Sequence, residues 1–238
     1  MNAERFLGGR VVARQSATGF RSGLDAVMLA AAVPAEGGDE ALELGSGAGT
    51  ASLCLAARTG CRVVGVEIDP ALAALARENA QTNRASAEFT CADIFDLPQA
   101  LKRDFTHVLC NPPFHEGEAS PDPARDRALR DGGQRLCSWI ASGLKRTVSG
   151  GTFTLILRAD RLAEVLAALP GRGTVIFPLW PKQGEAAKRV IVQARKGARA
   201  APVLLPGLVL HQADGAYTPE ADAVLRDGAS LALDSRRL

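Results

Sequence analysis

Short apolar runs and helical patterns alternate along most of the chain. Continuous apolar or β-branched runs predict seven strands, at Ala41–Leu44, Arg62–Val66, Ala87–Cys91, His107–Cys110, Thr152–Leu157, Thr174–Phe177 and Arg189–Ala194. Helices are predicted between many of them, at Thr50–Ala57, Ala71–Ala80, Gln134–Arg146 and from Asp160 through Leu169. Strands that alternate with helices predict an α/β domain, in which helices cover both faces of a mainly parallel sheet.

Two terminal segments, 1–38 and 199–238, fall outside this alternation. Neither holds enough apolar residues for a core of its own, so both are expected to pack on a single domain that spans residues 1–238. In the first segment, Ser22 and Asp25 have the spacing of a capping box before the apolar run Ala26–Pro34. This spacing predicts that Asp25 helps to start a helix.

Composition narrows the class of protein. With 47% hydrophobic and 23% charged residues, the chain is expected to be globular, and no apolar run is long enough for a membrane span. No signal peptide is visible, so a cytoplasmic location is expected. Five scattered cysteines and three histidines lack the spacing of a disulfide framework or a metal site, so no metal is expected. A net charge of +2 is small for a protein that coats nucleic acid, although a local basic face is compatible with it.

A glycine-rich turn, Glu43-Leu44-Gly45-Ser46-Gly47-Ala48-Gly49, follows the first predicted strand and opens a helix. Glycines there let the backbone come close to a ligand at the start of the helix. Glu67 stands about twenty residues further on, at the tip of the next strand, where an acid holds a ribose diol. Asp93, after the third strand, can accept a hydrogen bond from an adenine amine, with Ile94 as an apolar wall. Together these features predict a ligand that carries an adenosine.

The most informative motif is Asn111-Pro112-Pro113-Phe114, directly after the fourth predicted strand. Two prolines fix the backbone, and they hold a carboxamide, a carbonyl and an aromatic ring at the carboxyl edge of the sheet. Hydrogen-bond acceptors beside a stacking ring suit a planar amine or amide substrate. Without the glycine-rich turn upstream, a rigid loop with a packed Phe114 would be the simpler interpretation.

The order ELGSGAG, VEID, ADIFD and NPPF resembles the class I S-adenosylmethionine-dependent methyltransferases that methylate a planar nitrogen. Stretches at 20–25, 187–197 and 211–218 resemble the bacterial tRNA adenine-N6 methyltransferases that modify an adenosine beside the anticodon. The resemblance implies a Rossmann-like fold with a seven-stranded, mostly parallel sheet, and methyl transfer to the N6 amine of an adenosine in tRNA. Phe114 departs from the commoner tyrosine, which keeps the stacking ring but removes a hydroxyl.

The resemblance also implies roles for individual residues. Asn111 Oδ1 and the Pro112 carbonyl accept the two protons of the target amine, while Phe114 stacks on the base. Residues 1–38 pack over the cofactor, with Asp25 near its methionine end. The residues expected to bind S-adenosylmethionine are Asp25, Glu43, Gly45, Ser46, Gly47, Gly49, Glu67, Ile68, Asp93, Ile94 and Asn111.

RNA is the expected partner. Residues 115–130 are expected to form a loop over the pocket, and basic stretches at 125–130 and 188–199 are candidates for phosphate contacts. The residues expected to bind substrate are Pro113, His115, Arg125, Lys188 and Arg189. Lys188 and Arg189 have an alternative interpretation, in which they pair with nearby acids such as Glu185.

Other functions remain as alternatives. The same motif would suit an rRNA guanine or adenine, or a protein glutamine as in release factors. A dehydrogenase is disfavoured because the glycine spacing is G-x-G-x-G and not G-x-G-x-x-G. A non-catalytic RNA-binding module is disfavoured because the catalytic motif is intact and few aromatic residues are present for stacking several bases.

Overall fold

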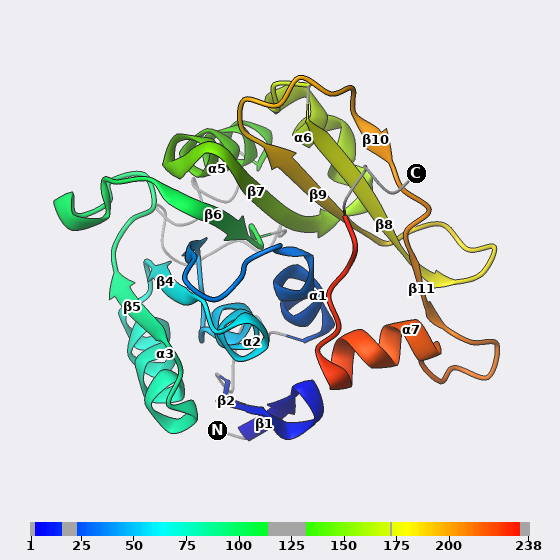
Figure 1. Ribbon diagram of the computed structural model, residues 1–238, viewed down its shortest axis with the longest axis horizontal. Coiled ribbons are helices and arrows are strands. Elements are labelled where there is room, and N and C mark those ends of the chain that lie inside the picture. The colour runs from blue at the N-terminus through cyan, green and yellow to red at the C-terminus, as the bar shows by residue number, and fades with distance from the viewer. Residues whose placement is uncertain (1–2, 16–22, 114–131, 172, 234–238) are drawn as a thin grey trace.

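A central sheet organises the protein in a computed structural model, which describes residues 3–15, 23–113, 132–171 and 173–233, without the side chains of 132–135 (Figure 1). Its main strands are β3 (Glu40–Leu44), β4 (Arg62–Glu67), β5 (Ala87–Cys91), β6 (Phe105–Cys110), β7 (Thr147–Arg158), β8 (Thr174–Lys182) and β9 (Arg189–Arg195). They lie in the order β5-β4-β3-β6-β7-β9-β8, and β9 is antiparallel to β7 and β8. The expected seven-stranded, mostly parallel sheet is confirmed. Two short strands, β10 (Val203–Leu204) and β11 (Leu208–His211), pair with β8 and bring the described sheet to nine strands.

Helices cover both faces of the sheet. One face carries α1 (Leu24–Ala32), α2 (Thr50–Thr59) and α3 (Pro70–Asn83), and the other carries α5 (Gly132–Arg146) and α6 (Leu162–Ala168). Alternate residues of β3 take part in the two cores: Ala41 packs with α1 and α2, while Leu42 packs with α5. Burying both faces explains why these strands read as continuous apolar runs.

The N-terminal segment adds a hairpin that the sequence pattern did not predict. Strands β1 (Ala3–Phe6) and β2 (Val11–Arg14) are antiparallel and are joined by the 3₁₀ turn η1 (Leu7–Gly9). Two amides of α3 hold β2: Asn79 Oδ1 accepts from Arg14 N at 2.9 Å, and Asn83 Oδ1 accepts from Val12 N at 2.8 Å. Asn79 Nδ2 also donates to Ala48 O at 2.9 Å, which ties the hairpin to the glycine-rich turn.

The C-terminal tail lies against α1. It contains α7 (Pro219–Asp222), the π-helical turn η4 (Ala223–Asp227) and an extended stretch in which Leu231 N donates to Ala31 O at 2.9 Å. Val224 and Leu231 are buried in the same apolar cluster as α1. None of the helices in the described ranges has both the length and the hydropathy to cross a bilayer.

Two predicted helix starts are wrong. Gly23, which has no side chain to cap the helix, is the N-cap of α1, so Asp25 is the second helical residue and not the third, as a capping box requires. Ser22, the other half of that box, lies outside the described residues. Asp160 lies in the 3₁₀ turn η3 (Ala159–Arg161), where its carboxylate accepts from Arg158, and α6 begins only at Leu162.

Candidate active site

Four parallel strands end together at one edge of the sheet. Leu44 of β3 is in register with Val66 of β4 and with Cys110 of β6, and Glu67 is in register with Cys91 of β5. The segments that follow these strands therefore meet at the carboxyl edge. Chain connections depart from β3 in opposite directions, towards β4 and β5 on one side and β6 on the other. Such a switch point is where open α/β sheets bind ligands.

The glycine-rich turn leaves space at one position only. Gly45 and Gly49 are closed in by aromatic rings: a Cβ at Gly45 would lie 2.5 Å from the Trp139 ring, and one at Gly49 would lie 2.6 Å from the Phe89 ring. Gly47 has a φ of +54°, yet a Cβ there would meet no atom within 4 Å. Packing therefore accounts for the outer two glycines, while the middle one faces open space in which a ligand can approach the backbone.

Glu67 is fixed against this turn. Its Oε2 accepts from Gly47 N at 2.8 Å and its Oε1 accepts from Asp69 N at 3.0 Å, and the residue is only 8% exposed. Asp69 in turn caps α3, because its Oδ1 accepts from Ala71 N at 2.8 Å. The carboxylate predicted to hold the ribose diol is thus already oriented by the backbone amides of Gly47 and Asp69.

Apolar surface is exposed beside Glu67. Ile68, the next residue, is 61% exposed, and Phe95 is 46% exposed with its ring edge-on to that of Trp139, 6.5 Å between centroids. Ile94 is buried. Asp93 is exposed, and its Oδ1 accepts from Phe95 N at 2.8 Å, which closes a turn. Apolar side chains next to a turn-fixed carboxylate suit a flat heterocycle with a polar edge.

Glu43 belongs to the interior. Its Oε2 accepts from Ser52 N at 2.9 Å and from the Ser52 hydroxyl, which joins β3 to α2. Burial raises the pKa of this carboxyl to about 8, although the hydrogen bonds from Ser52 oppose the rise. Glu43, which was predicted to bind the cofactor, is therefore hydrogen-bonded to Ser52 within the protein. Ser46, another predicted cofactor residue, is also buried, and its hydroxyl has no hydrogen-bond partner among the described residues.

The raised pKa of Glu43 predicts a pH dependence of folding. The folded state keeps a proton that the unfolded chain loses above pH 4.5, so the free energy of unfolding should fall between pH 4.5 and about 8. The contribution of one proton is at most about 1.4 kcal/mol per pH unit. Glu43→Gln should remove this slope, as urea unfolding at pH 5 and pH 8 would show. The exposed Glu78→Gln variant is the matched control, and parallel profiles for Glu43→Gln and wild type would contradict the assignment.

Asn111 carries a buried acceptor that no described residue pairs. Its Oδ1 is shielded from solvent and accepts no hydrogen bond within the described part of the chain. Native structures leave few buried polar atoms unpaired, and such an atom next to a binding crevice suits a ligand donor. Pro112, directly after it, is buried, while Pro113 is exposed. Phe114, His115 and Arg125 lie outside the described residues, so their roles stay predictions.

Asp25 and Arg189 form an ion pair at the same edge. Arg189 Nε donates to Asp25 Oδ2 at 2.8 Å, and the Asp25 side chain is 14% exposed. The acid that pairs with Arg189 is therefore Asp25 of α1, from the expected cofactor set, rather than Glu185. Lys188 is exposed. A pair between α1 and β9 joins elements far apart in sequence, and no local signal points to it.

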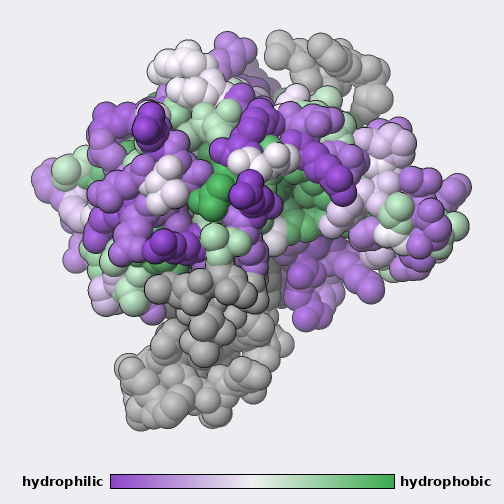
Figure 2. Space-filling view, turned by 90° about the horizontal axis from the view of Figure 1, so that it is seen from below, coloured by the Kyte–Doolittle hydropathy of each residue, from purple (hydrophilic) through white to green (hydrophobic). Residues whose placement is uncertain are grey.

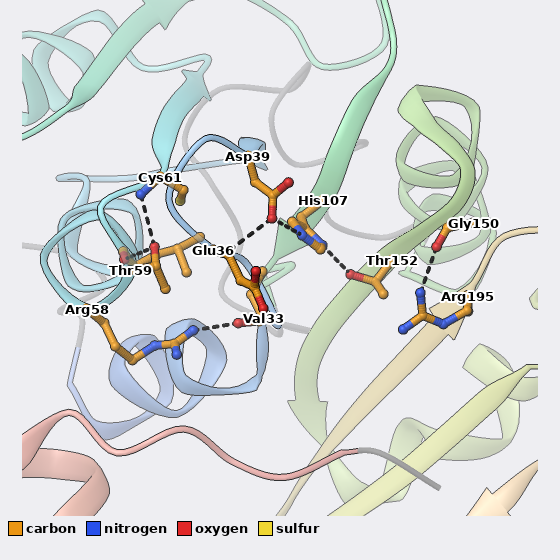
Figure 3. A network of polar contacts seen from close by, with 11 residues as sticks. Val33, Glu36, Asp39, Arg58, Thr59, Cys61, His107, Gly150, Thr152 and Arg195 are labelled. Atoms are coloured by element: carbon orange, nitrogen blue, oxygen red, sulfur yellow. Dashed lines mark hydrogen bonds and ion pairs between the residues drawn. The ribbon is translucent and has the colours of Figure 1, made fainter. Parts of the chain in front are cut away.

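A second polar cluster lies at the opposite edge, where β3 and β6 begin (Figure 3). His107 Nδ1 lies 2.8 Å from Thr152 Oγ1, and its Nε2 lies 3.3 Å from Asp39 Oδ2. Since a carboxylate only accepts, Nε2 carries the proton and Nδ1 accepts from the threonine hydroxyl. Burial lowers the pKa of His107. Thr152 is fully buried, so no substrate reaches its hydroxyl and the cluster joins β6, β7 and the loop before β3.

Comparisons with known proteins point to one family. The family model "Methyltransferase small domain" matches residues 22–139. A protein of Shewanella amazonensis named tRNA1(Val) (adenine(37)-N6)-methyltransferase is 29% identical over 212 residues, which cover 85% of this chain and 89% of the relative. A protein of the same name from Actinobacillus pleuropneumoniae serotype 7 is 30% identical over 200 residues, covering 82% and 84%.

Solved structures show the same fold. The crystal structure of a predicted O-methyltransferase, protein Atu636 from Agrobacterium tumefaciens, has a TM-score of 0.71 and 29% identity, and the match covers 87% of this chain and 98% of that one. TrmN from Thermus thermophilus has a TM-score of 0.51 and 24% identity, over 72% of this chain and 48% of its own. Fold, motifs and relatives agree, and the chain belongs to the methyltransferase small-domain family, as an enzyme of the group that includes the tRNA1(Val) (adenine(37)-N6)-methyltransferases.

Proposed function

We propose that this protein transfers a methyl group from S-adenosylmethionine to the N6 amine of an adenosine in tRNA, next to the anticodon. The observation that carries the proposal is Asn111 Oδ1, which no described residue pairs, at the carboxyl edge of β6 and next to β3, the strand that leads into the open turn at Gly47. The names of the curated relatives support the choice of adenosine and of tRNA. The enzyme would act in the cytoplasm. It would form a single domain, since residues of both terminal segments share one buried cluster with α1.

The residues present suit S-adenosylmethionine. Gly47 would admit the methionine part to the backbone, Glu67 would accept from the ribose hydroxyls, and the exposed Ile68 would cover the adenine. Asp93 would accept from the adenine amine and Asp25 would lie towards the methionine end. When bound, the cofactor supplies an electrophilic methyl group on a sulfonium centre.

The protein's part in the chemistry is to orient an amine. The lone pair of an adenine amine is delocalised into the ring, so the nitrogen is a poor nucleophile. Asn111 Oδ1 and the Pro112 carbonyl would each accept one amine proton, which fixes the nitrogen and stabilises positive charge that develops on it. Phe114 would stack on the base. Such a base must be splayed out of the RNA, and an anticodon loop allows this at lower cost than a helix.

Labelled cofactor tests the proposal directly. The protein should transfer methyl label from S-adenosylmethionine to a tRNA pool, and nucleoside digestion should give N6-methyladenosine. Label in rRNA, in a release factor or in DNA would show that the enzyme methylates a planar nitrogen of another substrate. Label recovered as a 2′-O-methyl nucleoside would contradict an amine-orienting site, and it would instead match an O-methyltransferase, as the Agrobacterium protein is described.

A further inference from the structure

A hollow lies outside the proposed catalytic site, between the terminal segments. It is a cavity of about 410 Å³ where β1 and η1 meet the start of α1 and the tail around η4. Its lining includes two apolar residues of α1, Leu24 and Val27, one aromatic residue, Tyr217, and two arginines, Arg5 and Arg226. The volume lies in the range of small-ligand sites. The apolar and aromatic residues suit the base of a nucleotide, and the two arginines suit its phosphate.

The aromatic face is held in place. Tyr217 stacks on His211 with 4.8 Å between ring centroids and 22° between planes, and the two residues form an isolated β-bridge. His211 Nδ1 lies 3.1 Å from Gly215 O, which fixes the imidazole that supports the ring. Tyr217 is nevertheless 36% exposed. An oriented, partly exposed ring is what base stacking requires, and it loses little freedom on binding.

The two cations differ in their surroundings. Arg226 Nε contacts Asp222 Oδ1 at 2.7 Å, so a nearby acid partly neutralises it. Arg5 is exposed and makes no ion pair with any described residue. Two guanidinium groups against one acid leave the pocket net positive, which favours a phosphate.

The pocket lies beyond the same edge of the sheet as Asn111. Paired residues trace this edge from strand to strand. Cys110 of β6 pairs with Leu155 of β7, and Arg158 of β7 pairs with Arg189 of β9. Arg189 also pairs with Leu179 of β8, and Lys182 of β8 pairs with His211 of β11. Each step stays at the carboxyl ends of the parallel strands. Asp25, in the helical turn whose Leu24 lines the pocket, is bonded to Arg189 at this edge. Figure 2 views the molecule from below Figure 1, the side on which β1 and α7 lie, and hydrophobic side chains show there between hydrophilic ones.

We infer that this pocket binds a nucleotide of the substrate RNA other than the one that is methylated. Its base would stack on Tyr217 against the wall formed by Leu24 and Val27, and Arg5 would contact its phosphate. The inference rests on the proposed RNA substrate and adds a second point of recognition on the same edge of the sheet. A loop RNA with one base in each site would be held in a defined register.

Equilibrium binding and steady-state kinetics on the same tRNA test this inference. Tyr217→Ala should raise both the Kd for tRNA and the KM about 10-fold, since one base–aromatic stack is lost, while kcat and cofactor affinity stay near wild type. Tyr217→Phe should restore binding because the ring is retained. Arg5→Ala should reduce the slope of log K against log salt by about 0.7. Arg62→Ala, which removes an exposed arginine where β4 begins, is the control and should leave RNA binding unchanged.

The outcomes separate this inference from the proposed function. If the wild type methylates tRNA and both Tyr217→Ala and Arg5→Ala bind it normally, the pocket is not an RNA site and the proposed function stands. If the wild type methylates no RNA, the proposed function fails and the inference fails with it. Should Tyr217→Ala lose cofactor binding through misfolding, the salt slope of Arg5→Ala decides, because that side chain is exposed.

Discussion

Asn111→Ala should lower the single-turnover rate of methyl transfer by about 10²-fold or more and leave cofactor affinity near wild type. This is the size of effect expected when one preorganised electrostatic partner is removed from a reacting group. The same change should not destabilise the fold, because Asn111 Oδ1 accepts no hydrogen bond from the described residues and an unpaired buried acceptor costs stability. Loss of rate at an unchanged or higher Tm therefore distinguishes a catalytic residue from a structural one.

A conservative variant completes this test. Asn111→Asp keeps an oxygen that can accept from the amine, so it should recover part of the rate that alanine loses. A single-turnover rate for Asn111→Ala within a few-fold of wild type would overturn the acceptor-pair mechanism. A large fall in Tm would show instead that the carboxamide has a structural partner.

Glu67→Ala is expected to weaken S-adenosylmethionine binding by about 10-fold to 100-fold, the equivalent of about 1.5–3 kcal/mol for hydrogen bonds to a charged group. Two effects combine, because the carboxylate would bind the ribose and also holds Gly47 N at 2.8 Å. Isothermal titration calorimetry measures the change. Glu88→Ala, which removes an exposed glutamate from the neighbouring strand β5, serves as the control. Equal affinities for wild type and Glu67→Ala would remove this residue from the site.

The sequence pattern correctly predicted helices and strands whose positions depend on residues nearby in the sequence. The run Ala87–Cys91 was predicted with the bounds of β5, and the helix predicted from Ala71 begins one residue earlier, at Pro70. The predicted strand began at Thr152, directly after the glycine pair at 150–151, whereas β7 begins at Thr147. In the structure the pairing of β6 with β7 shifts register between Phe105 and His107, and Gly150 has a φ of +81°. The pair therefore makes a bulge inside a strand rather than a turn before it.

Elements with distant partners escaped prediction. Strands β1 and β2 are short, and β2 depends on the amides of Asn79 and Asn83 in α3, which no local pattern announces. The ion pair of Asp25 with Arg189 likewise joins residues far apart in the sequence, so no local pattern predicts it. For the site, motif spacing brought Gly47, Glu67 and Asn111 to one edge of the sheet, but the pocket beside Tyr217 could not be foreseen. It is assembled from both terminal segments, and its parts share no motif.

The contrast between Gly47 and Gly49 has a consequence for comparing relatives. Gly49 is surrounded by Phe89 and Ala76, so a lineage that has lost catalysis but still needs a folded protein must keep glycine there. Gly47 faces open space, so that lineage is free to accept Asn or Asp, which tolerate a positive φ. On the proposed role of Gly47, a descendant with glycine at 45 and 49 but not at 47 would fold and yet lose cofactor binding. Under the proposed function, the middle glycine of the turn, and not the count of glycines, is therefore the position to compare between relatives.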